Sequence, residues 1–236
     1  MLAIIKKSWE DFFSLKMLIL NIFPVLIGVL FWGTLLFYFN EDIFEWLKHL
    51  LPTNWQNLSD NKGFFVGIGN LFIKSLLYIL LAFLMIILTL IGNVFVSIFY
   101  TPIVISYLHK KYYRDLQIDS FGNILSSMGY FSKSFGYFLL FAIILTPLYF
   151  VPFIGIFAVL IPHFFFFKNT MLFDVGSSIF EKSDYRLILS EHKAKNYQIT
   201  AIAYLFSLIP IFNFLATLLQ TIIIARYLLE IKQNAN

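Results

Sequence analysis

Residues 17–39 form a continuous segment without any Asp, Glu, Lys or Arg. As an α-helix this segment would be about 35 Å long at 1.5 Å per residue, and the hydrocarbon layer of a bilayer is roughly 30 Å thick. It is too long for the apolar region of a signal peptide, and it lacks a small-residue cleavage site. We therefore interpret it as the first membrane span, with Pro24 expected to bend it.

Composition supports the same class for the whole chain. Hydrophobic residues make up 60% of the sequence and charged residues 13%, against roughly 45–50% and 25% in soluble domains. The absence of cysteine excludes disulfides and thiolate chemistry. The net charge of +4 is modest and the basic residues lie between apolar blocks, which indicates membrane lipids as partners and no nucleic acid. We predict an all-α integral membrane protein.

A second apolar block covers residues 63–108 and is interrupted only by Lys74. A single helix of this length would extend for about 69 Å, more than twice the hydrocarbon thickness. The block contains either two spans joined at Gly92-Asn93 or one long second transmembrane helix. We favour the long helix, broken near Pro102, because proline is the stronger helix breaker.

Two shorter segments flank the first span. Residues 1–16 have an apolar helical face, which predicts a helix in the headgroup layer; it consists of Leu2, Ile5, Trp9, Phe12 and Phe13. The alternative is a short helix that folds back on the protein. Residues 40–62 are polar and acidic, and we expect them to form an extracytoplasmic loop with a short helix.

Blocks 136–167 and 199–225 are each split by a proline followed by Gly or Asn. Pro152 and Gly155 divide the first, and Pro210 and Asn213 divide the second. Proline disfavours helix at the preceding residue, and Gly and Asn tolerate positive φ. The arms on either side are about 11–16 residues, too short to cross a bilayer comfortably. We predict two re-entrant, half-inserted helical hairpins, joined by a basic cytoplasmic linker at 168–198.

The charge distribution favours these hairpins over four full spans. Basic residues outnumber acidic ones in most polar segments, whereas the 40–62 loop is acidic. By the positive-inside rule every polar segment except 40–62 is cytoplasmic, including both termini. Two spans and two same-side hairpins satisfy this assignment. The chain is predicted to be a multi-pass protein of the inner (cytoplasmic) membrane.

This order of parts resembles the CysZ sulfate permease family, which shares its domain with etoposide-induced membrane proteins. The resemblance covers roughly residues 1–232. It rests on the amphipathic start, the long second apolar block reaching Pro102, and the Pro-split segments Tyr149–Gly155 and Leu208–Phe214.

The resemblance implies a homo-oligomer that moves sulfate into the cytoplasm. Two motifs associated with sulfate in that family differ in this sequence. Where the family has an arginine pair before the first span, this chain has Lys16. Where the family has Gly-Leu-Leu-Ala-Glu after the proline of the second span, this chain has Ile105–His109.

Several polar residues are candidates for an anion path. Lys74 lies inside the second block, either snorkelling to an interface or lining the path. Asn213 lies at a hairpin tip, where a turn-forming role alone could explain it. For the cations near helix ends we expect headgroup anchoring, and attracting an anion is the alternative. The anion-path candidates are Lys16, Lys74, Pro102, His109, Lys110, Lys111, Asn213 and Arg226. For other intramembrane polar residues (Asn93, His163, Thr217, Gln220) we expect hydrogen bonds between helices.

No enzyme constellation is present in the sequence. The four histidines lie in different segments and show no ligand spacing, so we expect no cofactor, no metal and no catalytic site. The leading hypothesis is a permease or channel for a small inorganic anion, with sulfate the first candidate. The alternative is a non-transporting scaffold whose half-inserted hairpins shape the bilayer.

Overall fold

The computed structural model describes residues 1–49, 71–72, 75, 78–79, 81, 100–151, 154–209 and 212–235. They belong to two compact units. One unit consists of Met1–Ile19 and Ser97–Asn236, and the other of Leu20–Val96. All regular elements among the described residues are helices. The predictions for Lys74, Asn93, Pro152 and Pro210 lie outside the described residues.

Three described helical segments are long and apolar enough to cross a membrane. They are Leu15–Tyr38, Leu125–Phe150 and Ile154–Ser177. The first is helix α2 (Leu15–Tyr38), which covers nearly the same residues as the predicted first span and contains Pro24. The chain is therefore a multi-pass helical membrane protein.

The second unit holds most of α2 and all of α3 (Asn40–His49). Glu41 and Asp42 lie in the first turn of α3, where a negative charge interacts favourably with the helix dipole. The rest of the acidic loop and most of the second apolar block fall outside the described residues. Helix α6 (Tyr100–Tyr112) continues through Pro102 and includes the basic residues that follow the block.

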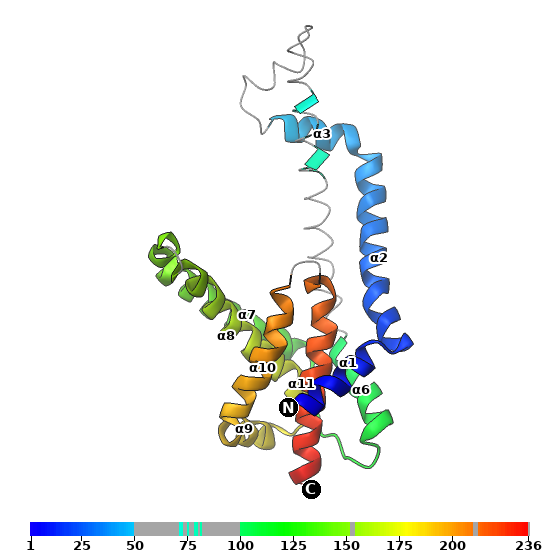
Figure 1. Ribbon diagram of the computed structural model, residues 1–236, viewed down its shortest axis with the longest axis vertical. Coiled ribbons are helices and arrows are strands. Elements are labelled where there is room, and N and C mark those ends of the chain that lie inside the picture. The colour runs from blue at the N-terminus through cyan, green and yellow to red at the C-terminus, as the bar shows by residue number, and fades with distance from the viewer. Residues whose placement is uncertain are drawn as a thin grey trace. The chain divides into compact units, whose positions relative to one another are not determined.

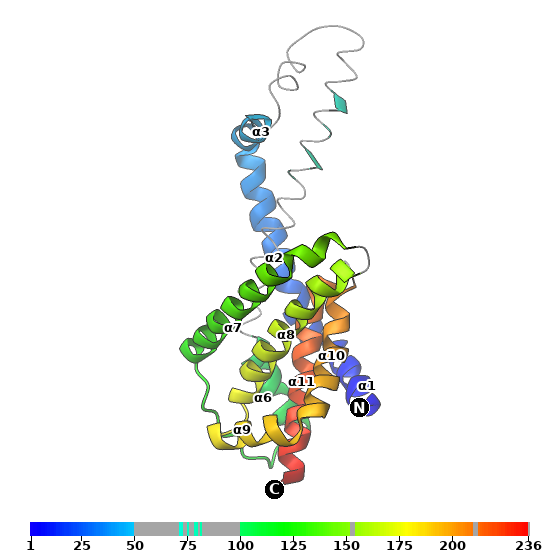
Figure 2. The same ribbon diagram turned by 90° about the vertical axis from the view of Figure 1, so that its left-hand side faces the viewer.

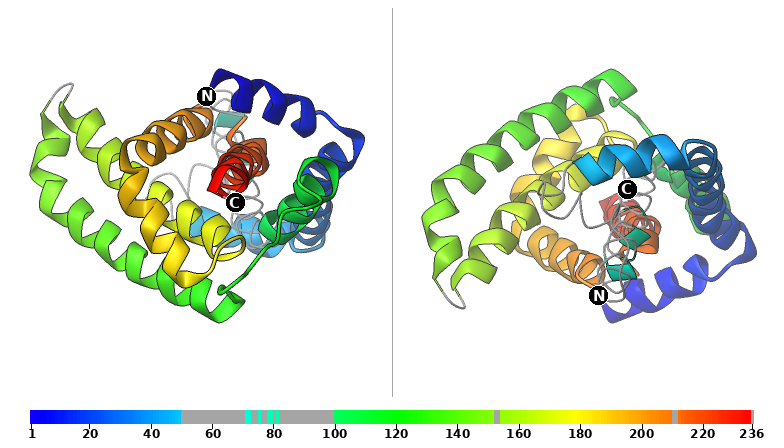
Figure 3. Two further views of the ribbon diagram at one scale, coloured as in Figure 1. Left: turned by 90° about the horizontal axis from the view of Figure 1, so that it is seen from below. Right: turned by 90° about the horizontal axis from the view of Figure 1, so that it is seen from above.

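In the first unit the central helix is α11 (Asn213–Ala235). Helices α1 (Leu2–Phe12), α6, α8 (Ile154–Ser177) and α10 (Lys193–Ser207) pack against it, as Figure 3 shows for the red helix in the left-hand view. Every residue from Leu218 to Leu229 is buried. A helix enclosed on all sides has no polar face, so any charge it carries must find a partner inside the bundle.

Polar side chains join the helices of this bundle. Gln220 Nε2 donates to the carbonyl oxygen of Ala203 at 3.0 Å, which links α11 to α10. His163 Nδ1 lies 2.9 Å from the hydroxyl of Tyr204 and links α8 to α10. The expectation of interhelical hydrogen bonds is confirmed for these two residues. Thr217 makes none within the described part of the chain.

The first Pro-split block is a helical hairpin, but its arms are longer than the sequence suggested. Helix α7 (Ile124–Leu145) and the 3₁₀ turn η1 (Thr146–Phe150) form one arm and α8 the other; they lie side by side in Figures 1 and 2. Helices α7 and α8 have 22 and 24 residues. The estimate of arms too short to cross a bilayer was therefore wrong, and half-insertion stays a prediction.

The extra length of α7 has a local cause. Asn123 caps the helix, because its Oδ1 accepts from the backbone N–H of Ser126 at 2.7 Å. The hydroxyl of Ser126 in turn accepts from the backbone N–H of Asn123 at 2.9 Å. This capping box starts the helix well before the apolar block at 136.

Gly155 is needed at the hairpin turn for a different reason from the one predicted. A Cβ built on Gly155 would lie 2.6 Å from the backbone oxygen of Tyr149. The backbone of Gly155 does not have a positive φ. Close approach of two backbone segments, rather than left-handed conformation, requires a glycine here.

The second Pro-split block is also a helical hairpin. Helix α10 begins at Lys193 and α11 ends at Ala235, so both arms extend beyond the predicted limits of 199–225. The predicted linker 168–198 is mostly helical, since α8 continues to Ser177 and α9 covers Lys182–Glu191. Half-insertion of this hairpin is likewise a prediction.

The end of α11 is fixed to two loops. Lys232 Nζ donates to the carbonyl oxygen of Ile179 at 2.9 Å and to Asp119 Oδ2 at 3.1 Å. The pKa of Asp119 is lowered, mainly by the hydrogen bond from Lys232. This contact holds the central helix in register with the loops on either side of α7 and α8.

Helix α1 packs on the protein with only part of its predicted apolar face. Ile4, Ser8, Asp11 and Phe12 are buried, whereas Leu2 and Phe13 of the predicted apolar face are exposed. One face of α1 therefore folds back on the protein, as the alternative interpretation of this segment expected. The exposed apolar residues remain available to the headgroup layer, so the interfacial role stays a prediction.

Candidate functional site

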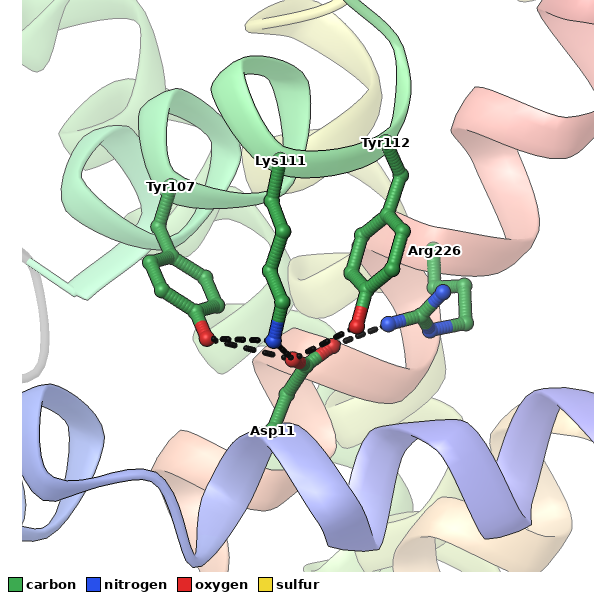
Figure 4. A network of polar contacts seen from close by, with 5 residues as sticks. All are labelled: Asp11, Tyr107, Lys111, Tyr112 and Arg226. Carbon is green, nitrogen blue, oxygen red and sulfur yellow. Dashed lines mark hydrogen bonds and ion pairs between the residues drawn. The ribbon is translucent and has the colours of Figure 1, made fainter.

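The first unit contains a polar cluster centred on the buried carboxylate of Asp11 (Figure 4). One oxygen of Asp11 pairs with the guanidinium of Arg226. The other accepts from Lys111 Nζ at 2.7 Å, from the hydroxyl of Tyr112 at 3.1 Å and from that of Tyr107 at 3.2 Å. We refer to these five residues as the Asp11 cluster.

Three helices build the Asp11 cluster. Helix α6 supplies Tyr107 and Lys111, which lie four residues apart on one helical face, and Tyr112, which is its last residue. Helix α11 supplies Arg226 from the middle of its buried stretch. Asp11 comes from the last turn of α1 and is fully buried. The cluster therefore joins the N-terminal helix to the centre of the bundle.

The tyrosines of the cluster have two roles. Their hydroxyls donate hydrogen bonds to Asp11, and their rings stabilise the nearby cations. Lys111 Nζ lies 5.2 Å from the ring centroid of Tyr107 and 5.0 Å from that of Tyr112. The guanidinium carbon of Arg226 lies 4.5 Å from the Tyr112 ring. Lys16 Nζ lies 5.6 Å from the ring of Tyr107, which brings a third cation to the edge of the cluster. Such contacts contribute about 0.5–2 kcal/mol each, more where water is excluded.

Positive charge is in excess at this place. Lys111 and Arg226 both pair with the one carboxylate of Asp11, and Lys16 lies over the ring of Tyr107. Hydrogen bonding to Asp11 is the main cause that raises the pKa of Lys111, so this lysine stays protonated at neutral pH. The Nε atom of Arg226 is buried and has no hydrogen-bond partner in the described part of the chain. The cluster can therefore accommodate more negative charge than Asp11 alone supplies.

The expectation that Arg226 anchors to lipid headgroups was wrong. Only 1% of its surface is exposed, and its partner Asp11 is equally buried. The apolar block ends at 225, but the helix continues to Ala235 and places Arg226 inside the bundle. A buried guanidinium requires a buried anion, because its desolvation would otherwise cost several kcal/mol.

The remaining candidates lie away from the cluster. Lys110 is exposed on α6, and Pro102 is exposed in the same helix. His109 Nε2 contacts the carbonyl oxygen of Leu116 at 2.8 Å in the loop after α6. Asn213 is exposed at the start of α11, roughly 20 Å along the helix from Arg226.

Asp11, Tyr107 and Tyr112 were not among the predicted site residues. Asp11 lies beside Glu10 in a charged stretch that reads as a solvated helix face. The available signal was Arg226 itself, because an arginine in a long apolar helix calls for an acidic partner elsewhere in the chain. The sequence could not identify which of the acidic residues that partner is.

Comparison with known proteins gives one positive result. The chain matches the family described as sulfate transporter CysZ/etoposide-induced protein 2.4 over residues 4–217. No curated protein and no solved structure matches significantly. The matched range begins in α1 and includes the first hairpin and α10, but it ends at Thr217 near the start of α11 and does not reach Arg226. The resemblance seen in the sequence is thus confirmed, and the chain belongs to the family of sulfate transporter CysZ and etoposide-induced protein 2.4.

Proposed function

We propose that this protein is a membrane permease or channel for a small inorganic anion, with sulfate the first candidate. Family membership and the three apolar helices support transport across a membrane. We place it in the inner membrane, and the positive-inside rule favours cytoplasmic termini. We further propose that it works as a homo-oligomer.

The observation that carries this proposal is the surplus of cations around Asp11. Arg226, Lys111 and the two tyrosines direct their hydrogen-bond donors at one carboxylate. Such a set of cationic and hydroxyl donors can also bind other oxyanions. A cationic lining away from bulk water concentrates anions and lowers the energy of an anion inside a low-dielectric protein.

In this mechanism the permeating anion exchanges with the carboxylate of Asp11. Arg226 and Lys111 are bound to Asp11 in the structure, so the site is filled by the chain's own anion. An arriving anion interacts first with Lys16 at the edge and then with Lys111, which is 44% exposed. Because Asp11 competes with it, the substrate is held weakly enough to leave again, as conduction requires.

Uptake of radiolabelled sulfate into proteoliposomes tests the proposal, with chloride and phosphate as comparison anions. Saturable sulfate uptake above that of empty liposomes is the expected result. Absence of flux for all three anions, in a preparation whose oligomeric state has been verified, would remove the permease hypothesis.

A second function is favoured by the exposed hairpin α7–η1–α8. Only 6% of the apolar window in its first arm and 17% of that in its second are buried by protein. Such a hairpin could act as a wedge in the bilayer, and the two sulfate-associated motifs that differ in this sequence fit a non-transporting scaffold. Liposome tubulation without anion flux is the outcome that selects this function.

A further inference from the structure

A second polar site lies in the first unit, separate from the Asp11 cluster. It is a cavity of about 160 Å³ between α7, α8, α9 and α10, and it shares no residue with the cluster. A cavity of about 150 Å³ holds a molecule the size of benzene. The space is therefore large enough for a phosphate group.

The charged residues of this cavity are all cationic. Lys168 of α8 and Lys193 of α10 line it, and its lining includes no Asp or Glu. Lys168 Nζ lies 3.9 Å from the ring centroid of Tyr197 and 5.7 Å from that of Phe165, so aromatic rings hold this ammonium group in place. Neither lysine forms an ion pair within the described part of the chain.

Neutral hydrogen-bonding groups complete the lining. Asn169 follows Lys168, and Tyr130 of α7 closes the cavity on another side. Asn196 is buried and fixed, since its amide donates to the carbonyl oxygen of Ile188 at 3.2 Å and its Oδ1 accepts from Tyr227 at 2.8 Å. Two ammonium groups beside amide and phenol groups suit an oxyanion such as phosphate.

An apolar stripe on α8 leads to this cavity. Phe157, Ile161 and Phe165 follow one another at intervals of four residues and are 62%, 49% and 42% exposed. Residues at this spacing lie on one face of a helix, and the next residue in the series is Asn169 of the cavity. The stripe belongs to a candidate membrane span. An acyl chain lying along it would bring its own headgroup to Lys168.

We propose that the cavity binds the phosphate of an anionic phospholipid, whose acyl chain lies along Phe157, Ile161 and Phe165. The phosphate contacts Lys168 and Lys193, and the amides of Asn169 and Asn196 surround it. This lipid site stands on its own contacts, whether or not the protein transports anions.

Native mass spectrometry of the full chain tests the proposal, after reconstitution in neutral phosphatidylcholine with increasing phosphatidylglycerol. Each lysine near a membrane surface contributes a few-fold to anionic-lipid binding, so Lys168→Gln and Lys193→Gln should each weaken retention of phosphatidylglycerol about fivefold. Lys168→Arg should retain it. Lys182→Gln, an exposed residue at the start of α9 that loses the same charge, is the matched control.

Two results would overturn the lipid site. One is retention of phosphatidylglycerol that Lys168→Gln leaves unchanged in a variant with normal helix content by circular dichroism. The other is protection against thermal unfolding by inorganic phosphate, in lipid-free detergent, equal to that by phosphatidylglycerol, because the ligand would then be a free anion. Protection by the lipid alone supports the proposal.

Discussion

Arg226 and Asp11 form an ion pair that is buried on both sides, although 215 residues separate them in the chain. The pair joins the central helix α11 to the N-terminal helix α1. Lys111 of α6 binds the same carboxylate, so three helices meet at one charged group. This arrangement gives the bundle a fixed register and supplies the surplus cations on which the proposed anion path depends.

Removing one partner of this pair should destabilise the protein strongly. Asp11→Asn leaves Arg226 buried without a counter-ion, and such a change costs about 3–5 kcal/mol. We expect a clear fall in the midpoint of thermal unfolding in detergent. Lys7→Gln, an exposed charge on the same helix, is the control and should leave the midpoint unchanged.

The double variant Asp11→Leu with Arg226→Met tests where such a loss comes from. The loss could come from leaving Arg226 buried without a counter-ion, or from losing a net stabilisation by the ion pair. Replacement of a whole buried ion pair by apolar residues is often neutral or stabilising. We therefore expect the double variant to unfold at a higher temperature than Asp11→Asn. If it unfolds lower, the pair contributes net stability beyond compensating for its own burial.

The turn between η1 and α8 should not tolerate a side chain at Gly155. In Gly155→Ala the new Cβ would meet the backbone oxygen of Tyr149 at 2.6 Å, so one segment of the turn must move. We expect lower thermal stability and altered proteolysis at the hairpin tip.

Gly136→Ala in α7 is the matched control for the turn. Nothing lies within 4 Å of a Cβ there, and alanine favours helix over glycine by about 1 kcal/mol. This control should be neutral or stabilising. Equal destabilisation by both substitutions would show that the close approach at Gly155 is unimportant.

The contact between Lys232 and Asp119 should depend on pH. The pKa of Asp119 is lowered in the folded protein, mainly by Lys232, so its contribution is present above the unfolded pKa of about 3.9. That contribution is lost as pH falls through the folded pKa. The difference in unfolding midpoint between the parent and Asp119→Asn should be measurable at pH 7 and shrink as pH falls below the unfolded pKa and through the lowered folded pKa of Asp119. If the difference in unfolding midpoint did not change with pH, the ion pair between Lys232 and Asp119 would not be its source.

The helical class and the places of both hairpin turns could be predicted from apolar blocks and prolines. The lengths of the hairpin arms could not, because hydropathy marks only the apolar part of a helix. Helix α7 begins at a capping box formed by polar residues, Asn123 and Ser126, and α8 continues through Lys168 and Asn169.

The candidate site was predicted only in part. Lys16, Lys111 and Arg226 were candidates from their charge and their place near helix ends. The structure pairs Lys111 and Arg226 with one carboxylate and places Lys16 over the ring of Tyr107. Asp11 could not be chosen from the sequence, because the pairing depends on how α1 and α11 pack. Lys110 illustrates the same limit, because it has the same charge as its neighbour Lys111 but is exposed and forms no ion pair with Asp11 in the described part of the chain.

The most direct test of the proposed anion path compares two charge-matched double variants in sulfate uptake by proteoliposomes. Lys16→Gln with Lys111→Gln removes two cations at the Asp11 cluster, and Lys6→Gln with Lys7→Gln removes two exposed cations of α1. We expect the initial uptake rate of the first variant to fall at least tenfold and that of the second to equal the parent rate. Equal uptake by both variants would show that the Asp11 cluster is not part of an anion path.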